Sequence, residues 1–347
     1  MVPALAVADA LRAEGAHVVF VGGERAERTM VPEAGYELRP IAVEGLSRSN
    51  PLKAARAVLR AAGAVVAARR ILRDVRPDAV LGAGCYVAGP VGLAAVARRV
   101  PIVLAEADSH LGLTNRLLAR RARRVCLAFP IAGRDGERYV VTGRPVPPPV
   151  TDRAAARARF GLTQDETCVL VFGGSLGART INEAAVQALA GADFRVLHAC
   201  GARDYEALRA RLGPHPPANY DLREFITPFG DALLAADLCV ARAGGSIFEI
   251  AAHGRPAILV PYPYASADHQ SANARWMEQA GAAVVVPDAE LTPARLASEV
   301  TQLLADRARL AVMGRASASL ARPEAAQRIA EEVLAAARPP STAAPDT

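Results

Sequence analysis

Short apolar runs alternate with longer segments of helical spacing along nearly the whole chain. The first run, His17–Val21, follows a helical segment that begins near Pro3 and stops at Gly15. Proline in the first turn and glycine past the end are typical of a helix. Further strand-like runs are Ala79–Leu81, Ile102–Ala105, Val125–Leu127, Cys168–Phe172, Arg195–Ala199, Leu238–Val240, Ile258–Val260 and Ala283–Val286. Continuous apolar strands separated by helices predict parallel sheets covered on both faces.

One stretch, TGRPVPPPVTD at Thr142–Asp152, breaks this alternation. Its prolines cannot join the interior of a sheet and form a stiff connector instead. We therefore predict an α/β protein with two Rossmann-like, doubly wound domains that face a central cleft. The N-terminal domain covers residues 1–147, the C-terminal domain covers 148–338, and residues 339–347 form a disordered tail.

Composition narrows the classes of function. A hydrophobic fraction of 52% over 347 residues supports two buried cores. The net charge of +6 is carried almost wholly by arginine, since Lys53 is the sole lysine. Arginine binds phosphates bidentately, which favours an anionic partner. Aromatic residues make up only 5% and no RNA-binding signature occurs, so we expect no nucleic-acid partner.

Cysteine usage and hydropathy bear on the compartment. The five cysteines are scattered without a CxxC pair, which favours small buried hydrophobic residues in a reducing compartment. The most membrane-like stretch, 61–68, is flanked by Arg60 and Arg69 and is far shorter than the ~20 apolar residues of a spanning helix. A soluble or peripheral protein is expected.

Two glycine-rich turns join a predicted strand to a helix. The first is Gly173-Gly174-Ser175-Leu176-Gly177, and the second is Gly244-Gly245-Ser246 with Glu249 in the first helical turn. Glycines allow close backbone approach, and the N–H groups at a helix start favour phosphate. Glu249 could accept hydrogen bonds from two ribose hydroxyls. The alternatives are a tight turn and simple complementarity of Glu249 to the helix dipole.

Other polar residues also follow predicted strands. One polar cluster consists of Asp268, His269, Gln270 and Asn273. Its side chains either form hydrogen bonds with sugar hydroxyls or cap a helix. In the first half, LGAGCYVAGP is another glycine turn, and Glu106 and Asn115 follow the strand at 102–105. No P-loop lysine, nucleophile elbow or HExxH motif is present.

Two basic helical segments could rest on anionic lipid headgroups. One carries Lys53, Arg56 and Arg60, and the other carries Arg116, Arg120, Arg121, Arg123 and Arg124. The alternative is a solvated helix face.

Taken together, the motifs resemble the MurG family of N-acetylglucosaminyltransferases. The matching pieces run in the family's order from Pro3 to about Leu334. They are PALAVADAL, GAGCYVAGP, GLTNRLLA, VFGGSLGARTIN, EFITPFGDALLAADL, RAGGSIFEIAAHGRPAILVPYP and DHQSANA. The resemblance implies the GT-B fold and an inverting transfer of GlcNAc from UDP-GlcNAc to lipid I, which forms lipid II for peptidoglycan.

The resemblance also implies a role for individual residues. In the C-terminal domain, Ser175 and the surrounding glycines would bind the phosphates, and the backbone of Ile226 would bind the uracil. Glu249 would bind the ribose hydroxyls, and Gln270 would bind the GlcNAc sugar. Gly244, Gly245 and Ser246 belong to the same donor site, which Asn115 and Arg144 complete. On the acceptor side, the Tyr86 loop helps to hold the pyrophosphate, and Glu106 lies nearby.

The resemblance extends to cofactors and partners. No cofactor is required, and Mg²⁺ is at most a stimulator. The partners implied are UDP-GlcNAc, lipid I at an anionic membrane surface, and other cell-wall synthesis proteins. The enzyme is then peripheral at the cytoplasmic face of the membrane, which its N-terminal domain meets.

The chain departs from the family pattern chiefly at its start. The family opens with a strand, a glycine-rich loop and a His just ahead of the segment that corresponds to PALAVA. The general base expected from the family would therefore lie upstream of Met1, and no catalytic residue is assigned. The family's Asn-Pro-Val-Arg is here Arg144-Pro145-Val146-Pro147, and its His-Glu-Gln-Asn retains only Glu106.

Three hypotheses follow. The first is a lipid I transferase whose start lies further upstream. The second is another UDP-sugar transferase of the same fold with a lipid or natural-product acceptor, and assays with different acceptors discriminate it. The third is a non-catalytic nucleotide-sugar binder, which would bind UDP-GlcNAc without turnover.

Overall fold

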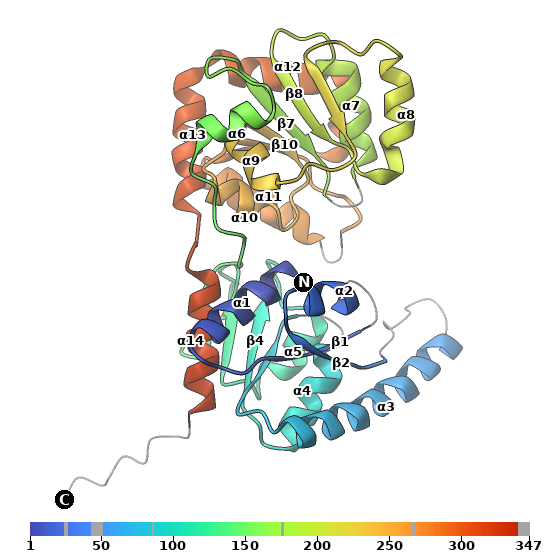
Figure 1. The fold of residues 1–347 in the computed structure, drawn as a ribbon, viewed down its shortest axis with the longest axis vertical. Helices are drawn as coiled ribbons and strands as arrows, with labels where there is room; N and C mark the ends of the chain where they lie inside the picture. The colour runs from blue at the N-terminus through green and yellow to red at the C-terminus, as the bar shows by residue number, and fades with distance from the viewer. Residues whose placement is uncertain (24–26, 43–50, 85–86, 175–176, 266–267, 339–347) are drawn as a thin grey trace, which may run out of the picture. The chain divides into compact units, whose positions relative to one another are not determined.

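The computed structural model describes residues 1–23, 27–42, 51–84, 87–174, 177–265 and 268–338, with side chains of the long helix α3 described from Ala62 onwards. The chain divides into two units (Figure 1). The first comprises Met1–Val146 together with Arg322–Thr347, and the second comprises Pro147–Ala321. The predicted disordered tail, 339–347, lies outside the described residues.

Unit 1 is built from strand–helix repeats whose described strands are all parallel to their neighbours. Its elements are α1 (Val2–Ala13), β1 (Val19–Gly22), α2 (Glu27–Glu33), β2 (Glu37–Pro40), α3 (Pro51–Val75), β3 (Val80–Gly82), α4 (Ala88–Ala97), β4 (Ile102–Glu106), α5 (Leu113–Leu118), β5 (Arg124–Leu127), β6 (Tyr139–Val141) and α14 (Ala325–Ala337). The described strands form two separate sheets, β1-β2 and β3-β4-β5-β6.

Helix α14 belongs to unit 1 although it ends the chain, so the prediction of one domain over 148–338 is wrong for this helix. Its apolar face, with Ile329 and Val333, packs with Val7 and Leu11 of α1 and Val103 of β4. Arg124 adds an ion pair to Glu332 at 3.0 Å. Burial of one apolar stripe therefore decides where α14 lies.

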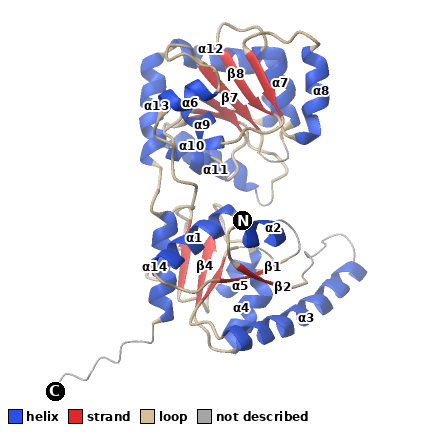
Figure 2. Cartoon of the chain, viewed as in Figure 1, coloured by secondary structure: helices blue, strands red, loops and turns tan. Residues whose placement is uncertain are grey.

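Unit 2 has the same alternation of strands and helices (Figure 2). Its elements are α6 (Arg153–Arg159), β7 (Cys168–Phe172), α7 (Arg179–Leu189), β8 (Arg195–Ala199), α8 (Ala202–Leu212), β9 (Tyr220–Arg223), α9 (Phe229–Ala235), β10 (Leu238–Ala241), α10 (Ile247–Ala252), β11 (Ala257–Leu259), α11 (His269–Gln279), β12 (Ala283–Val285), η2 (Asp288–Glu290), α12 (Pro293–Ala305) and α13 (Arg307–Ser319). Side chains cap three of its helices, since Asp152, Thr292 and Asp306 accept backbone N–H bonds at the starts of α6, α12 and α13.

The described strands of unit 2 form one parallel sheet in the order β12-β11-β10-β7-β8-β9. The chain proceeds outward from β7 to β9, then returns to β10 and proceeds outward on the other side. The order therefore reverses between β7 and β10. Every residue of these two strands is buried. The predicted α/β class with two Rossmann-like, doubly wound domains is confirmed.

The nine strand-like runs predicted from the sequence all contain strands of the structure, and three further strands escaped prediction. These three are β2, β6 and β9, and each lies at an edge of its sheet. An edge strand is covered less completely, so it needs no continuous apolar run. The segments Glu37–Pro40 and Tyr220–Arg223 are accordingly polar.

Four cysteines confirm the prediction of small buried side chains. Cys126, Cys168, Cys200 and Cys239 are buried free thiols, and burial raises the pKa of Cys168 and Cys239 to about 12. Cys85 lies outside the described residues. Over the described ranges, no helix is both long enough and apolar enough to cross a membrane.

Candidate functional site

The carboxyl ends of β7 and β10 lie side by side in unit 2. The two strands pair in parallel, with Phe172 opposite Ala241. One predicted glycine turn follows each of these ends, so Gly173 and Gly174 lie at the same edge of the sheet as the segment 244–246. In doubly wound sheets, the point where strand order reverses is the usual ligand crevice.

The turn after β7 depends on glycine for space. A Cβ at Gly173 would lie 2.3 Å from the amide nitrogen of Ala178, and one at Gly177 would lie 2.1 Å from the carbonyl oxygen of Cys200. Gly177 also has φ of +70°, a conformation that disfavours other residues. Glycine therefore lets this loop fold tightly onto α7 and β8. Ser175, a predicted phosphate ligand, lies outside the described residues.

Helix α7 begins without a side-chain cap. Its N-cap is Ala178, and no described side chain accepts a hydrogen bond from the first turn. The first N–H groups of a helix carry partial positive charge and need acceptors. An anionic group of a ligand can supply those acceptors, which fits the prediction of a phosphate site at this turn.

A buried polar network fixes the position of α7. Asn182 donates through Nδ2 to the carbonyl of Cys200 at 2.9 Å and to Asp204 at 3.1 Å. Its Oδ1 lies 3.1 Å from His198 Nε2, and His198 Nδ1 lies 2.9 Å from the Tyr220 hydroxyl. Burial lowers the pKa of His198 to about 3, so this imidazole stays neutral and acts as a structural hydrogen-bond partner.

The turn after β10 is supported by α11. Asn273 donates through Nδ2 to the carbonyl of Ala243 at 3.0 Å, and Gln270 accepts from the amide of Tyr262 at 3.0 Å. A Cβ on Gly244 would lie 3.9 Å from Nε2 of Gln270. The structure thus brings together two predicted donor-site residues, Gly244 and Gln270.

Arg242, which precedes the same turn directly after β10, ties it to the end of β11. It is buried, donates to the carbonyls of Val260 at 3.1 Å and Pro261 at 3.2 Å, and pairs with Asp288. Its guanidinium also lies 5.5 Å from the ring centre of Tyr262. This arginine therefore joins the ends of β10 and β11, and these contacts are all internal to unit 2.

Two further predicted donor-site residues lie near this edge of the sheet. Glu249 is half-buried in the first turn of α10, three residues after Ser246. Ile226 is 6% exposed and follows β9. Three residues later, the ring of Phe229 contacts that of Phe172 at a centroid distance of 4.9 Å, which brings this segment back to the end of β7. Binding roles for Glu249 and Ile226 stay predictions.

In unit 1, Glu106 and Asn115 contact each other at the carboxyl end of β4. Asn115 Nδ2 donates to Glu106 Oε2 at 2.9 Å and to the carbonyl of Ala105 at 3.1 Å. Glu106 also accepts from the amides of Asp108 at 3.2 Å and Gly112 at 2.8 Å. Asn115 is 1% exposed and holds the loop 106–115 in shape, and its part in donor binding stays a prediction.

Two further residues of unit 1, Tyr86 and Arg144, are among those predicted from the sequence. Tyr86 lies outside the described residues. Arg144 is half-buried in the segment that leads to Val146. Across the described ranges, no three His, Cys, Asp or Glu side chains gather in a way that could hold a metal ion.

Sequence reasoning missed the residues that support the turns, chiefly Asn182, His198 and Arg242. Asn182 stands inside the quoted motif VFGGSLGARTIN, where its polar side chain on the apolar-rich face of a helix is the available signal. His198 lies in a strand and Arg242 directly after one, so apolar surroundings could have marked them as satisfied buried groups.

Comparison with protein families and solved structures extends these observations. Residues 168–329 match the glycosyltransferase family 28 C-terminal domain, and residues 1–127 match the corresponding N-terminal domain. A UDP-N-acetylglucosamine–N-acetylmuramyl-(pentapeptide) pyrophosphoryl-undecaprenol N-acetylglucosamine transferase of Salinibacter ruber is 42% identical, with 96% of this chain and 93% of that protein covered. The protein of that name from Moorella thermoacetica is 41% identical, with 96% and 94% covered.

Among solved structures, that of Acinetobacter baumannii MurG is similar, with a TM-score of 0.77, 30% identity, and 96% of this chain and 95% of that one covered. The calicheamicin glycosyltransferase CalG4 has a TM-score of 0.68 at 21% identity, with 96% and 94% covered. The latter likeness concerns the fold alone.

Proposed function

The chain belongs to glycosyltransferase family 28 and has the GT-B fold, and from this premise we propose that it transfers GlcNAc from UDP-GlcNAc to lipid I. The chain is a glycosyltransferase, because it matches relatives that are named as N-acetylglucosamine transferases over nearly their whole length. We place the donor site where β7 and β10 end side by side, because the strand order reverses there and a glycine turn follows each strand. Lipid I is undecaprenyl-pyrophosphoryl-MurNAc-pentapeptide, and the product is lipid II.

Unit 2 binds the donor in this proposal. The uncapped start of α7 faces the diphosphate, and its N–H groups stabilise the negative charge that grows on UDP as the sugar leaves. Gln270 binds the GlcNAc hydroxyls from its place beside Gly244. Glu249 accepts from the ribose hydroxyls, and the backbone at Ile226 reads the uracil ring.

Unit 1 binds the acceptor. The loop held by Glu106 and Asn115 follows β4 at the carboxyl edge of its sheet, where ligands of parallel sheets bind. The 4-hydroxyl of the MurNAc sugar attacks the anomeric carbon of GlcNAc, and the configuration inverts. A general base must take the proton of that hydroxyl. Mg²⁺ has no obligatory part here, since helix and backbone N–H groups supply the positive charge.

An exposed apolar and basic surface on unit 1 supports attachment to the cytoplasmic face of the membrane. Helices α4 and α5 pack together, and Leu93, Leu113 and Leu117 are 53%, 51% and 68% exposed on them. Beside these leucines, Arg116, Arg120 and Arg121 are also exposed. Exposed leucines flanked by arginines suit the headgroup region of an anionic bilayer. We call these six residues the α4–α5 patch.

Not every arginine of the predicted basic segment is free for lipid. Arg123 donates to the carbonyl of Ala336 at 3.1 Å, and Arg124 pairs with Glu332. Both therefore hold α14. Lys53, Arg56 and Arg60 have side chains outside the described residues. Contacts with other cell-wall synthesis proteins remain part of the proposal.

The proposal is tested by incubating the full chain with radiolabelled UDP-GlcNAc and lipid I in detergent or anionic vesicles. Formation of lipid II with release of UDP supports it. Transfer to a different polyprenyl or natural-product acceptor, with lipid I inert, would favour another UDP-sugar transferase. Saturable UDP-GlcNAc binding with no transfer to any acceptor would favour a nucleotide-sugar binder.

A further inference from the structure

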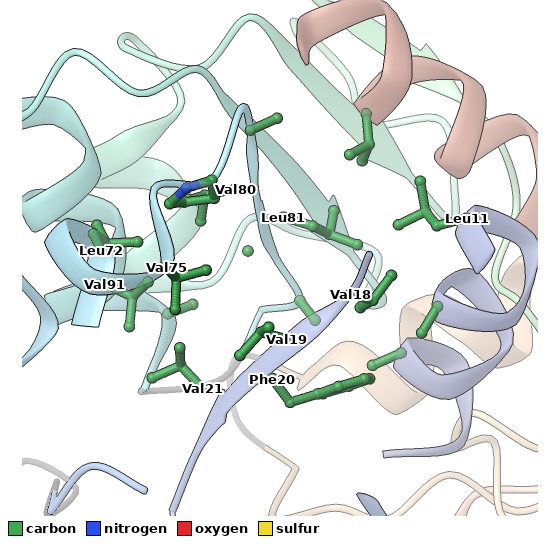
Figure 3. Close-up of a pocket in the computed structure, with 18 of the residues that line it drawn as sticks. Leu11, Val18, Val19, Phe20, Val21, Leu72, Val75, Val80, Leu81 and Val91 are labelled. Atoms are coloured by element: carbon green, nitrogen blue, oxygen red, sulfur yellow. The ribbon is translucent and has the colours of Figure 1, made fainter. Parts of the chain in front are cut away.

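A cavity lies at the amino ends of β10 and β11 in unit 2, across the sheet from the carboxyl ends where we place the donor. Its volume is about 460 Å³, and small-molecule sites typically measure about 300–1,000 Å³. Unit 1 holds a larger cavity of about 540 Å³, with apolar side chains such as Leu72 and Val80 in its wall (Figure 3). The cavity of unit 2 differs in charge, because three arginines line it, namely Arg255, Arg307 and Arg315. We call it the arginine cavity.

Arg255, which lies two residues before β11, forms no ion pair with a described carboxylate. Its Nε donates to the carbonyl of His253 at 2.8 Å, and its Nη1 donates to the carbonyl of Ala236 at 2.9 Å. Burial and then the nearby charge of Arg153 lower the pKa of Arg255, but a guanidinium stays protonated in a protein. A cation withdrawn from water in this way is stabilised by an anion beside it.

The carboxylate in the cavity wall, Asp237, already serves other groups. It accepts from Arg153 at 2.8 Å and from the amide of Cys168 at 2.9 Å, and Arg157 lies 3.7 Å from it. Its single negative charge is therefore shared between Arg153 and Arg157, and the charge of Arg255 remains in excess.

One face of α13 brings two further guanidinium groups to the cavity. Arg307 and Arg315 are both exposed, and they line the cavity with residues spaced three or four positions apart along the helix. Arg307 donates to the hydroxyl of Thr167, whereas Arg315 has no hydrogen bond or ion pair with a described residue. Leu310 and Pro256 add apolar surface to the same wall. The cavity therefore combines excess positive charge with an apolar area.

His253 also lines the cavity, but both of its ring nitrogens are engaged. Its Nδ1 lies 2.8 Å from the carbonyl of Glu249 and must donate to it, so Nε2 is the acceptor for the amide of Val150 at 3.2 Å. Burial lowers the pKa of this imidazole, which keeps it neutral. The positive charge of the cavity thus comes from its arginines.

We propose that the arginine cavity binds a phosphate monoester, whose phosphate is held by Arg255 and Arg315 and whose organic part covers Leu310 and Pro256. Arginine binds phosphate oxygens through paired N–H groups, and a dianion offsets the excess positive charge of this wall. The proposal goes beyond the transferase activity and does not depend on it.

The test is isothermal titration calorimetry of the full chain at constant ionic strength, with saturating UDP present to occupy the proposed donor site. The probes are phenyl phosphate, inorganic phosphate and phenol. We expect one phenyl phosphate to bind per chain, about tenfold more tightly than inorganic phosphate, because its ring covers apolar surface. Phenol should not bind, since it lacks the anion. Phenol binding as tightly as phenyl phosphate would overturn the proposal.

Arg315→Gln should weaken the binding of phenyl phosphate about tenfold, because a charged hydrogen bond is lost. Arg309→Gln is the matched control, since Arg309 is an exposed arginine of the same helix that does not line the cavity. It should leave the binding unchanged. Equal weakening by the two variants would mean that net charge alone attracts the anion, and unaltered binding in Arg315→Gln would also overturn the proposal.

Ala311→Glu places a carboxylate in the cavity wall and should abolish binding of phenyl phosphate. Ala308→Glu is its control, because Ala308 is exposed on the same helix outside the wall. Equal loss of binding in the two variants would contradict the site.

Lipid headgroups carry phosphate as well, so cosedimentation with phosphatidylglycerol vesicles is measured for the chain and for Arg315→Gln. We expect the same vesicle binding in both. Weaker vesicle binding by Arg315→Gln, together with no binding of phenyl phosphate by the chain, would assign the arginine cavity to a membrane and overturn the proposal of a soluble ligand.

Discussion

Oδ1 of Asn182 lies 3.1 Å from Nε2 of His198, which joins the helix after the first glycine turn to the middle of the sheet in unit 2. With Oδ1 as acceptor, Nε2 carries the proton and Nδ1 accepts from Tyr220. The imidazole is 0% exposed, so the positive charge that a second proton brings would have no water to solvate it. This pair therefore contributes to the dependence of the stability of unit 2 on pH.

The folded-state pKa of His198, about 3, lies far below the usual value of 6.5. Below pH 6.5 the unfolded chain binds a proton that the folded chain rejects, so stability falls as the pH falls toward 3. Between pH 7.5 and 5 this one group costs about 2 kcal/mol. Wild-type protein should lose that much more than a His198→Gln variant, measured by hydrogen exchange of the β8 amides. Identical pH dependence in the two proteins would refute the assignment.

Gly177 should contribute strongly to the stability of unit 2. In a Gly177→Ala variant, the methyl group meets the Cys200 carbonyl at 2.1 Å, so the free energy of unfolding should drop by about 3 kcal/mol or more. Gly191→Ala is a matched control, because its φ is also positive but nothing lies within 4 Å of the new Cβ. The control should lose only about 1 kcal/mol. Urea titration measures the free energy of unfolding of both variants. Equal losses of stability would contradict the close approach of Gly177 to the Cys200 carbonyl.

Gly244→Ala should show the opposite behaviour. The added methyl group meets nothing closer than Gln270 Nε2 at 3.9 Å, so the unfolding midpoint should stay unchanged. The methyl group does occupy the space in which we place the donor. We expect the KM for UDP-GlcNAc to rise about tenfold, the effect of losing ~1.4 kcal/mol of binding. An unaltered KM would place the donor elsewhere.

Gln270→Ala should lower kcat/KM for UDP-GlcNAc by about tenfold to a hundredfold, because both a ligand contact and the bond to the Tyr262 amide are lost. Gln302→Ala is the control, since Gln302 lies on α12 and bonds only to Ser298 among the described contacts. A Gln270→Glu variant retains the acceptor for Tyr262. If it behaves like wild type, Gln270 serves the turn and does not contact the sugar.

Leu117→Ser should weaken binding of the chain to vesicles that contain anionic phosphatidylglycerol about threefold to tenfold, because an apolar side chain of the α4–α5 patch is lost. Val312→Ser removes a similarly exposed apolar side chain, 55% exposed, from α13 of unit 2 and should have no effect. Cosedimentation at two salt concentrations measures both. Equal weakening by the two variants would exclude the patch as the membrane surface.

Much of the fold was predictable because a buried parallel strand must be apolar throughout. Residues Cys168–Phe172 and Leu238–Val240 mark the two central strands of unit 2, and the glycine turns after them were placed correctly for the same reason. The edge strands β2, β6 and β9 were not predictable, because water covers part of each, and polar residues such as Glu37 and Asp221 are tolerated there.

Long-range polar pairing was equally hidden from the sequence. Asn115 looks like a free polar residue at a helix start, and only the fold brings it within 2.9 Å of Glu106. Arg123 and Arg124 look like part of a basic face, yet their partners lie on α14, more than two hundred residues away along the chain. The charge and polarity of a side chain determine which groups it can bind, but the fold determines which of those groups lies close enough to bind.

The return of α14 to unit 1 sets the order in which the protein can mature on the ribosome. Chains are made from the N-terminus at about 5–20 residues per second, so α1 emerges well before its packing partner Ile329. The intervening chain takes roughly 15–65 s to synthesise at that rate. During that time Val7 and Leu11 lack the surface that later covers them. Unit 2, which is continuous from Pro147 to Ala321, can be complete before unit 1 is. The N-terminal unit is therefore the last to mature, and the one with most need of a chaperone.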